Sequence, residues 1–338
     1  MVRGRKAVVK APRELVIVEE EFPSPGKGEV LIKTKATLIS IGTELTKFSG
    51  DFPRGSHWDE VFRYPYSPGY SNCGEIIEVG EGVEGLEVGD RVASLGPHAE
   101  YVLMREGEVY PVPDGVSDEE ATFATLAATV MNGVRLADVK LGESVVVLGL
   151  GILGQLACQF SGLCGGFPVI GVDMSEKRLK LAEELGAALV LNPRRQDVRK
   201  EIERATKGRG ADVVFEVTGN PEVIPWGLRL TKRQGRFIVL SSPRGPSTVD
   251  FHDEVNWPSR IIIGTHFTSH PSCETPYNPW TVKRNIELFF DLILAGKVDV
   301  KKLITHRYPW TELGEVYRRL LDPLGDRLQY LGIILTYG

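Results

Sequence analysis

The chain has 338 residues, which is too many for a single compact core and therefore predicts two domains. Hydrophobic residues make up 42% of the chain and charged residues 25%, which is the profile of a soluble globular protein. The net charge of −5 argues against a nucleic-acid partner and against an anionic membrane surface.

Cysteine usage and the lack of long apolar segments predict a cytoplasmic protein. The four cysteines, Cys73, Cys158, Cys164 and Cys273, have irregular spacing and no CxxC pair, which indicates neither a disulfide framework nor a zinc knuckle and fits a reducing compartment. The first stretch, MVRGRKAVVKAPRELVIVEE, contains no apolar core of signal-peptide length, and no run of 18 apolar residues occurs in the sequence.

The chain begins with short strands. From Ala7 to about Val112, apolar alternation is interrupted by Gly and Pro at the spacing of an all-β domain; the segments are KAVVK, LVIVEE, EVLIKTKATLIS, GEIIEVG, DRVAS and AEYVLM. Around residues 111–114 the pattern changes to an alanine-rich, helix-permissive segment, DEEATFATLAATVMNGVRLADV.

Strands and helices then alternate. Apolar runs such as SVVVLG, PVIGVDM, ADVVFEVTG and RFIVLSS are separated by helical patterns, which predicts βαβ units and a buried parallel sheet. IIIGTHF is one further strand, and the tail holds an amphipathic helix, KRNIELFFDLILAG, and a strand-like ending, YLGIILTYG. The fold class is therefore α/β, with a doubly wound parallel sheet and a β-rich second domain.

The strongest functional motif is a glycine-rich loop. SVVVLGLGILGQLA places Gly149, Gly151 and Gly154 after an apolar strand and at the head of a helix. This arrangement allows a tight turn, lets the backbone approach a pyrophosphate and lets the helix pack close to the sheet, while the helix N-terminus offers N–H groups to the phosphates. Alternatively, the glycines only form a tight βα turn and bind no phosphate.

An acidic residue follows at the spacing of a dinucleotide site. Asp173 ends the next strand, 19 residues after Gly154 (173 − 154). A carboxylate there accepts hydrogen bonds from ribose hydroxyls and repels a 2′-phosphate, so it favours NAD over NADP. Asp173 could instead only cap the next helix, and Arg178 could either lie along the adenine or partly tolerate a phosphate.

With its β-rich first part, the sequence resembles the medium-chain dehydrogenase/reductase superfamily of zinc alcohol dehydrogenases and quinone reductases. The resemblance covers nearly the whole chain and rests on GEVLIKTKATLISIGTE, PGYSNCGEIIEVG, VEGLEVGDRVAS, GLGILGQ, GVDMSEKRLKLAEELGA and DVVFEVTGN. It implies a Rossmann domain, residues 129–266, inserted into a GroES-like substrate domain, residues 1–128 and 267–338. It also implies a homodimer or homotetramer, with a strand near IIIGTHF continuing the sheet across the dimer.

The sequence departs from the zinc members of this superfamily at each catalytic zinc ligand. Their Cys-Gly-Thr-Asp pattern is Ile41-Gly42-Thr43-Glu44 here, their Gly-His-Glu is Gly69-Tyr70-Ser71, and the third ligand corresponds to Thr125. The structural-zinc lobe would fall near SLGPHAEYV, which has no cysteine. A catalytic zinc needs three Cys, His or carboxylate ligands, so we predict no metal. The combination of Ser-Ile-Gly-Thr-Glu with Gly-Tyr-Ser looks most like a zinc-lacking branch of the superfamily, which includes relatives of bacteriochlorophyllide hydroxyethyl dehydrogenases.

Without a metal, a side chain has to exchange the proton of the substrate hydroxyl. Tyr70 matches a position that faces the substrate in relatives, and a tyrosine with a lowered pKa could donate to or accept from the alcohol oxygen; alternatively it only fills the vacated cavity. Thr43 matches the hydroxyl that touches the substrate oxygen, with turn capping as its alternative. Glu44 is expected to brace the fold.

His266, in IIIGTHFTSHP, is the competing acid/base, since an imidazole titrates near working pH. It could instead be a hydrogen-bonded histidine at a subunit interface. His270 and His57 are expected to be solvated in Pro-rich loops, and a metal shared by His266 and His270 lacks a third ligand.

The predicted cofactor is NAD. Its predicted contacts are Gly149, Gly151, Ile152, Leu153, Gly154, Asp173, Arg178, Thr129, Thr218, Ser241 and Phe267. The aromatic segment DFPRGSHWDEVFRYPYSPGY borders the substrate cleft in the family and could stack on a flat substrate or cover an edge or interface.

The leading functional hypothesis is an NAD-dependent, zinc-independent dehydrogenase of a secondary alcohol, such as a sugar, a polyol or a hydroxyethyl group. One alternative is an NAD(P)H-dependent reductase of a quinone or an activated double bond. The other is a catalytically silent dinucleotide-binding sensor.

Overall fold

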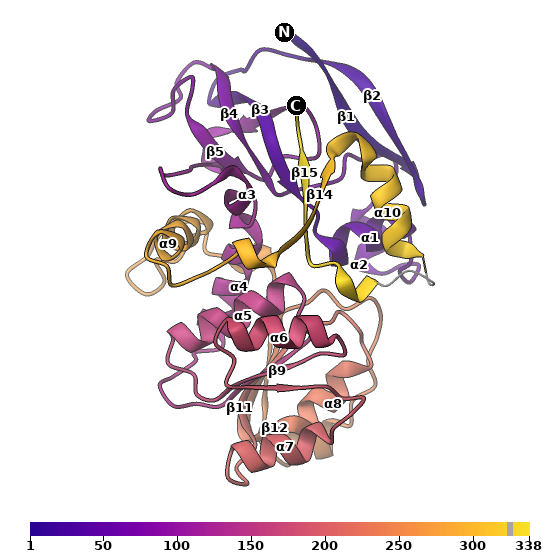
Figure 1. Ribbon diagram of the computed structural model, residues 1–338, viewed down its shortest axis with the longest axis vertical. Coiled ribbons are helices and arrows are strands. Elements are labelled where there is room, and N and C mark those ends of the chain that lie inside the picture. The colour runs from indigo at the N-terminus through magenta and orange to yellow at the C-terminus, as the bar shows by residue number, and fades with distance from the viewer. Residues whose placement is uncertain (323–326) are drawn as a thin grey trace. The chain divides into compact units, whose positions relative to one another are not determined.

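A computed structural model describes residues 1–322 and 327–338, and these fold into two compact units (Figure 1). The first unit comprises residues 1–125, 286–296 and 300–338, and the second comprises residues 126–285 and 297–299. Residues 267–285 therefore belong to the second unit, whereas the sequence analysis placed them in the first. The physical reason is that this segment is bonded to the helix that opens the second unit: Asn132 Nδ2 donates to Ser269 Oγ (2.8 Å) and Arg135 Nε to Asn285 Oδ1 (3.1 Å).

The first unit is built on strands from both ends of the chain. A hairpin consists of β1 (Val2–Ala11) and β2 (Glu14–Phe22). A seven-stranded sheet has the order β14-β15-β3-β4-β5-β7, with β6 also paired to β3. Its strands are β3 (Glu29–Leu38), β4 (Asn72–Val79), β5 (Arg91–Ser94), β6 (Tyr101–Arg105), β7 (Val109–Pro111), β14 (Ile304–Pro309) and β15 (Gly332–Thr336). The return of the C-terminal strands to this sheet confirms the expected GroES-like arrangement.

Short helices complete the first unit. They are α1 (Ile41–Ser49), α2 (His57–Val61), α3 (Asp118–Ala121) and α10 (Leu313–Leu321), and α4 (Ala124–Leu136) and α9 (Val282–Leu294) run across its boundaries with the second unit in sequence. Helix α1 ends because Gly50 takes a left-handed conformation, at φ 69°, and its N–H bonds back to Thr46 O. Phe48 on α1 and Tyr317 on α10 pack their rings 5.1 Å apart in one apolar core, which fixes α1 against the C-terminal helix.

The second unit is a doubly wound parallel sheet, as predicted. Its strand order is β10-β9-β8-β11-β12-β13, and every pairing is parallel. The strands are β8 (Val145–Leu148), β9 (Val169–Val172), β10 (Leu189–Leu191), β11 (Ala211–Glu216), β12 (Thr231–Val239) and β13 (Ile261–Gly264), and the helices are α5 (Ile152–Leu163), α6 (Glu176–Glu184), α7 (Val198–Ala205) and α8 (Val223–Leu230). The strand order reverses direction between β8 and β11, and such a switch point is where ligands bind in this fold class.

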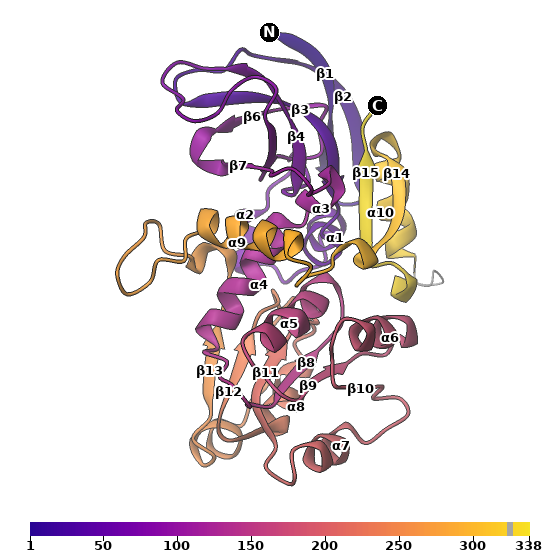
Figure 2. The same cartoon turned by 60° about the vertical axis from the view of Figure 1, so that its left-hand side comes forward.

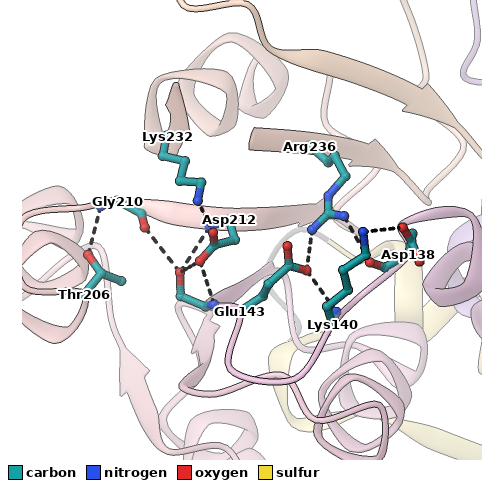
Figure 3. Close-up of polar contacts among 9 residues, drawn as sticks. Asp138, Lys140, Glu143, Thr206, Gly210, Asp212, Lys232 and Arg236 are labelled. Carbon is teal, nitrogen blue, oxygen red and sulfur yellow. Dashed lines mark hydrogen bonds and ion pairs between the residues drawn. The ribbon is translucent and has the colours of Figure 1, made fainter. Parts of the chain in front are cut away.

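Ion pairs and hydrogen bonds link the segment before β8 to the strands β11 and β12 (Figure 3). Near the start of β11, the Asp212 carboxylate accepts hydrogen bonds from Ser144 N (2.9 Å) and Ser144 Oγ (2.7 Å) and pairs with Lys232. Arg236 on β12 pairs with Glu143. These charges lie at the end of the sheet opposite to the phosphate loop.

Single-turn elements connect the larger ones: η1 (Glu106–Glu108), the π-helical η2 (His252–Asn256), η3 (Phe267–Ser269), η4 (Lys301–Leu303), η5 (Trp310–Glu312) and η6 (Arg327–Gln329). None of the helices in residues 1–322 and 327–338 combines the length and the apolar character that crossing a membrane requires.

Candidate functional site

The phosphate loop has the geometry that its sequence predicts. Gly149 follows β8 with φ at 95°, and a Cβ there would lie 2.9 Å from Thr218 Cγ2. A Cβ on Gly154 would lie 1.9 Å from the Gly149 carbonyl oxygen, so both positions require glycine for the turn itself. A Cβ on Gly151 would meet no atom within 4 Å. Gly151 therefore leaves open space at the start of α5.

This open space suits an anion. Gly151 is the N-cap of α5 and provides no side-chain hydrogen bond to the first turn, so the N–H groups of that turn remain for a ligand. Ile152 is buried and Leu153 half-buried. The residues present fit the pyrophosphate of a dinucleotide.

Asp173 is held rigidly beside this loop. Its Oδ2 accepts a hydrogen bond from Leu150 N (2.7 Å) and its Oδ1 from Ser175 N (2.8 Å), and its side chain is only 8% exposed. The N-cap of α6 is Ser175, which accepts from Arg178 N, so capping does not account for Asp173. Arg178 Nη1 lies 3.8 Å from Asp173 Oδ2. The two side chains from which the sequence analysis argued the preference for NAD or NADP are therefore adjacent.

A buried carboxylate that the sequence analysis missed organises the neighbouring loops. Glu216, at the end of β11, is fully buried. Its Oε1 accepts hydrogen bonds from Thr218 N (2.6 Å), Gly219 N (3.2 Å) and the Thr218 hydroxyl, and its Oε2 accepts from the Ser241 hydroxyl. Thr218 and Ser241, two predicted cofactor contacts, are thus joined through Glu216. The DVVFEVTG motif contained the residue, but nothing in the sequence showed what it would contact.

The remaining predicted residues of the second unit are Thr129, His266 and Phe267. Thr129 is half-buried on α4, and Phe267 opens η3, its ring 5.4 Å from that of His270. His266 is exposed, and its Nδ1 accepts a hydrogen bond from Thr268 N (3.3 Å). An imidazole whose Nδ1 accepts carries its proton on Nε2 when it is neutral.

His270 does not fit its expected role as a solvated histidine. It is half-buried, and both ring nitrogens face carbonyl oxygens, Nδ1 that of Phe267 (2.7 Å) and Nε2 that of Ala128 (3.2 Å). Because both ring nitrogens face carbonyl oxygens, neither is directed at a metal shared with His266. His57, in the first unit, is exposed as expected.

In the first unit, Tyr70 lies within a cluster of hydroxyl groups. Its phenol donates to Ser40 Oγ and also shares a hydrogen bond with Thr43, so the structure brings together the two catalytic candidates of this unit. Burial and the nearby Glu44 charge raise the pKa of Tyr70 to about 12, and the hydrogen bonds to Ser40 and Thr43 offset only part of this rise. The expectation of a lowered pKa is therefore wrong, because the sequence did not show the burial or the adjacent carboxylate. Tyr70 is a neutral proton donor.

Glu44 braces the unit, as expected. It is fully buried; its Oε1 accepts from Ser40 N (2.7 Å), and its Oε2 contacts His98 Nε2 (2.9 Å) and accepts from the Tyr317 hydroxyl. His98 Nδ1 in turn contacts Thr37 Oγ1 at 2.8 Å. The sequence analysis missed His98 and Tyr317, which have no motif of their own.

The positions that match the zinc ligands do not fit zinc. They hold the apolar Ile41, the phenol of Tyr70, which bonds to Ser40, and the hydroxyl of Thr125. Across the described parts of the chain, no three His, Cys, Asp or Glu side chains gather in a way that could hold a metal ion. No Cys, His or carboxylate ligand is available at these positions.

A lysine and an aromatic group lie next to the hydroxyl cluster. Lys47, one turn after Thr43 on α1, places Nζ 3.8 Å from the centre of the Phe62 ring and 5.9 Å from that of Tyr70. Burial lowers the pKa of Lys47. The rings of Phe52, Trp58 and Phe62 contact one another in sequence, with centres 6.3 Å and 5.3 Å apart.

Comparison with known proteins agrees with this architecture. Residues 26–114 match the alcohol dehydrogenase GroES-like domain, and residues 153–281 match the zinc-binding dehydrogenase domain. The L-threonine 3-dehydrogenase of Pyrococcus furiosus is 32% identical over 86% of this chain and 87% of its own length. The D-guloside 3-dehydrogenase of Shigella flexneri is 29% identical over 97% and 99%, respectively. The crystal structure of an alcohol dehydrogenase from Escherichia coli complexed with NADH superposes with a TM-score of 0.83 at 22% identity, covering 99% of each chain.

The chain belongs to the medium-chain dehydrogenase/reductase superfamily. It is an alcohol dehydrogenase-like oxidoreductase with a GroES-like unit and a Rossmann unit.

Proposed function

We propose that the protein is an NAD-dependent, zinc-independent dehydrogenase that acts on a secondary alcohol, such as a sugar, a polyol or a hydroxyethyl group. The observation that carries this proposal is the hydroxyl cluster of Ser40, Thr43 and Tyr70, in which Tyr70 matches a zinc-ligand position of zinc-dependent relatives, in a chain that retains the dinucleotide loop. The names of two relatives support the substrate class, since L-threonine 3-dehydrogenase and D-guloside 3-dehydrogenase both act at carbon 3.

NAD supplies the nicotinamide ring that exchanges a hydride with the alcohol carbon. The chain's own residues hold the cofactor: the first turn of α5 binds the pyrophosphate, and Asp173 accepts hydrogen bonds from ribose hydroxyls. The Asp173 charge disfavours a 2′-phosphate, although Arg178 at 3.8 Å weakens that discrimination. NAD is therefore the proposed cofactor, with residual tolerance of NADP.

The proton of the substrate is handled by side chains in place of a metal. With its pKa raised to about 12, Tyr70 remains protonated at working pH, and by turning its O–H away from Ser40 Oγ it donates a hydrogen bond to the substrate oxygen. Thr43 orients that oxygen. During oxidation the hydroxyl proton goes to a base, for which the exposed His266 is the candidate; because the neutral ring carries its proton on Nε2, Nδ1 has to release the hydrogen bond from Thr268 N to accept the substrate proton.

We also propose that the protein is a homodimer, formed through the exposed edge strand β13. Ile261 and Ile262 on this strand are 52% and 39% exposed. An apolar edge strand with unpaired backbone groups is a ready template for a second copy.

The test is the appearance of NADH absorbance with NAD⁺ and a panel of polyols, sugars, hydroxy acids and hydroxyethyl aromatics, with and without EDTA. We expect a rise that persists in EDTA. A rise that EDTA abolishes would contradict the metal-free route.

The alternatives predict other results in the same assay. Consumption of NADPH with a quinone or an enone would favour the double-bond reductase. Tight cofactor binding without turnover on either panel would favour the sensor.

A further inference from the structure

Lys47 carries a positive charge that no carboxylate balances at close range. Within residues 1–322 and 327–338, its ammonium group forms neither an ion pair nor a hydrogen bond. It lies instead against aromatic faces, with Nζ 3.8 Å from the centre of the Phe62 ring and 5.9 Å from that of Tyr70. An ammonium has three N–H donors, and an aromatic face satisfies them only weakly. The donors of Lys47 therefore remain for a ligand.

This charge has also lost part of its hydration. Lys47 is half-buried on α1, and burial is the main cause that lowers its pKa, against a smaller opposing effect of the Glu44 carboxylate. Glu44 does not supply the missing partner, because its two oxygens already accept from other groups, Ser40 N and the Tyr317 hydroxyl. A partly desolvated cation without an anion is unfavourable. A ligand that brings a negative group to this place gains a partner.

Lys47 shares a helix face with the proposed substrate contact Thr43. Both residues belong to α1 and are four apart in sequence, so their Cβ atoms lie about 5–6 Å from each other. Tyr70, which shares a hydrogen bond with Thr43, has its ring beside the ammonium. A group attached one or two carbons away from the alcohol carbon therefore reaches Lys47 while Thr43 and Tyr70 hold the alcohol oxygen.

Both the lysine and its aromatic neighbour are held in place. The Tyr64 hydroxyl donates to the Lys47 carbonyl oxygen (2.5 Å), and the adjacent Phe48 is fully buried in the core of the unit. Phe62, against which the ammonium lies, packs on Trp58 with ring centres 5.3 Å apart. The lysine is thus positioned before any ligand arrives, which lowers the entropy that binding has to spend.

We propose that Lys47 binds a carboxylate of the substrate, so that the alcohol oxidised here is a 2- or 3-hydroxy acid. The inference rests on the proposed function in one respect, namely that Thr43 and Tyr70 hold the reacting oxygen. One ammonium matches the single charge of a carboxylate, whereas a phosphate group carries a charge of about −1.5 to −2 at neutral pH. Lys47 takes no part in hydride or proton transfer and acts by fixing the orientation of the substrate.

The experiment compares kcat/KM with NAD⁺ for alcohols that are matched except in charge. One pair is 3-hydroxybutyrate and its methyl ester, and one set is gluconate, sorbitol and sorbitol 6-phosphate. Wild type should prefer the acids by about 10- to 100-fold, the range that a charge-assisted hydrogen bond contributes. The preference should lie mainly in KM, because the contact is the same in the ground state and in the transition state.

Variants of the full-length protein assign this preference to Lys47. Lys47→Met removes the charge and keeps an unbranched apolar chain beside Phe62, so the acid-to-neutral ratio of kcat/KM should fall to near one. Lys47→Arg keeps the charge and should retain most of the ratio. Lys35→Met is the matched control, since Lys35 belongs to the same unit and pairs with Glu75 at 3.3 Å; its ratio should equal that of wild type. A purely structural role of Lys47 would lower kcat/KM for acids and neutral alcohols alike.

Three results would overturn the proposal: use of sorbitol or sorbitol 6-phosphate as good as that of gluconate, a ratio that persists in Lys47→Met, or an equal loss in Lys35→Met. If Lys47→Met does not fold, Lys47→Gln, which keeps a polar end, takes its place. Turnover of neutral alcohols without a preference for acids overturns only the role of Lys47. If no alcohol of either panel yields NADH, the proposed function fails as well.

Discussion

The proposed metal-free chemistry depends most on the side chain at position 70. A phenol in place of an imidazole removes a metal ligand and adds a hydrogen-bond donor. Its surroundings then decide its protonation: burial, and to a smaller extent the nearby Glu44 carboxylate, disfavours the phenolate, so the phenol stays neutral. Tyr70 is therefore suited to polarise a substrate oxygen and unsuited to remove a proton from it.

We predict that Tyr70→Phe lowers kcat about 100-fold, the lower end of what a positioned proton donor contributes, without moving the pH profile. The profile should not move because a group with a pKa of about 12 does not titrate in the assay range. Steady-state kinetics across pH with the best substrate of the panel will check this. His266→Ala is the companion variant, and full kcat in both at every pH would show that neither residue acts on the proton.

Asp173→Ala should remove most of the preference for NAD over NADP, by about tenfold or more in kcat/KM, because the charge that repels a 2′-phosphate is lost while Arg178 remains. The substitution also leaves Leu150 N and Ser175 N without their acceptor, so the free energy of unfolding should fall by about 1–3 kcal/mol. Asp197→Ala, which removes a carboxylate that caps α7, is the control for lost backbone hydrogen bonds alone. An unchanged cofactor preference in Asp173→Ala would refute the ribose role.

At the scale of elements, β13 is an edge strand whose exposed apolar side chains do not pack within its own unit. Within the described part of the chain it pairs with β12 alone, at the edge of the sheet (Figure 2). Ile261 and Ile262 are exposed there, and Ile263 is half-buried. Within a single chain, three consecutive isoleucines there cost solubility and invite edge-to-edge pairing. A second copy that covers this edge accounts for them.

Ile262→Lys should therefore convert the proposed dimer into a monomer, because it places a charge on the edge that has to be buried. Light scattering coupled to gel filtration measures the mass directly. Ile262→Val keeps the edge apolar and should remain dimeric. A wild-type mass equal to that of one 37.3 kDa chain would dismiss the dimer without any variant.

At the scale of the whole molecule, local patterns in the sequence and the family resemblance together predicted the architecture. The apolar run of β8 and the glycines that follow it predicted the Rossmann unit, YLGIILTYG predicted a final strand, and the resemblance predicted its return to the first sheet. The hydrogen-bond partners within the site were not predictable, since they come from distant parts of the chain. Glu44 meets His98 and Tyr317, which are 54 and 273 residues away. The predicted roles of the site residues, and the absence of zinc, stay predictions.

The two units should differ in their sensitivity to alkali, because buried tyrosines are concentrated in the first unit. Phenols whose pKa is raised by burial gather in the first unit: Tyr66, Tyr70, Tyr110, Tyr317 and Tyr337. The only tyrosine of residues 126–285 is Tyr277, which is 99% exposed, although burial of the Cys158 thiol in that unit acts in the same direction.

We therefore predict that high pH destabilises the first unit before the second. A phenol with a folded-state pKa above its unfolded value binds more protons in the native state, so its stabilising contribution is complete below pH 10 and is lost as pH rises through the folded pKa, about 12 for Tyr70 and Tyr110. Calorimetric scans at about pH 8 and about pH 11 should show one transition moving to lower temperature more than the other. Tyrosinate absorbance followed during the same unfolding identifies the unit to which the shifted transition belongs, because almost all tyrosines lie in the first unit. If the tyrosinate signal develops before any transition shifts, the phenols ionise in the native state, and the inferred coupling of their burial to stability is incorrect.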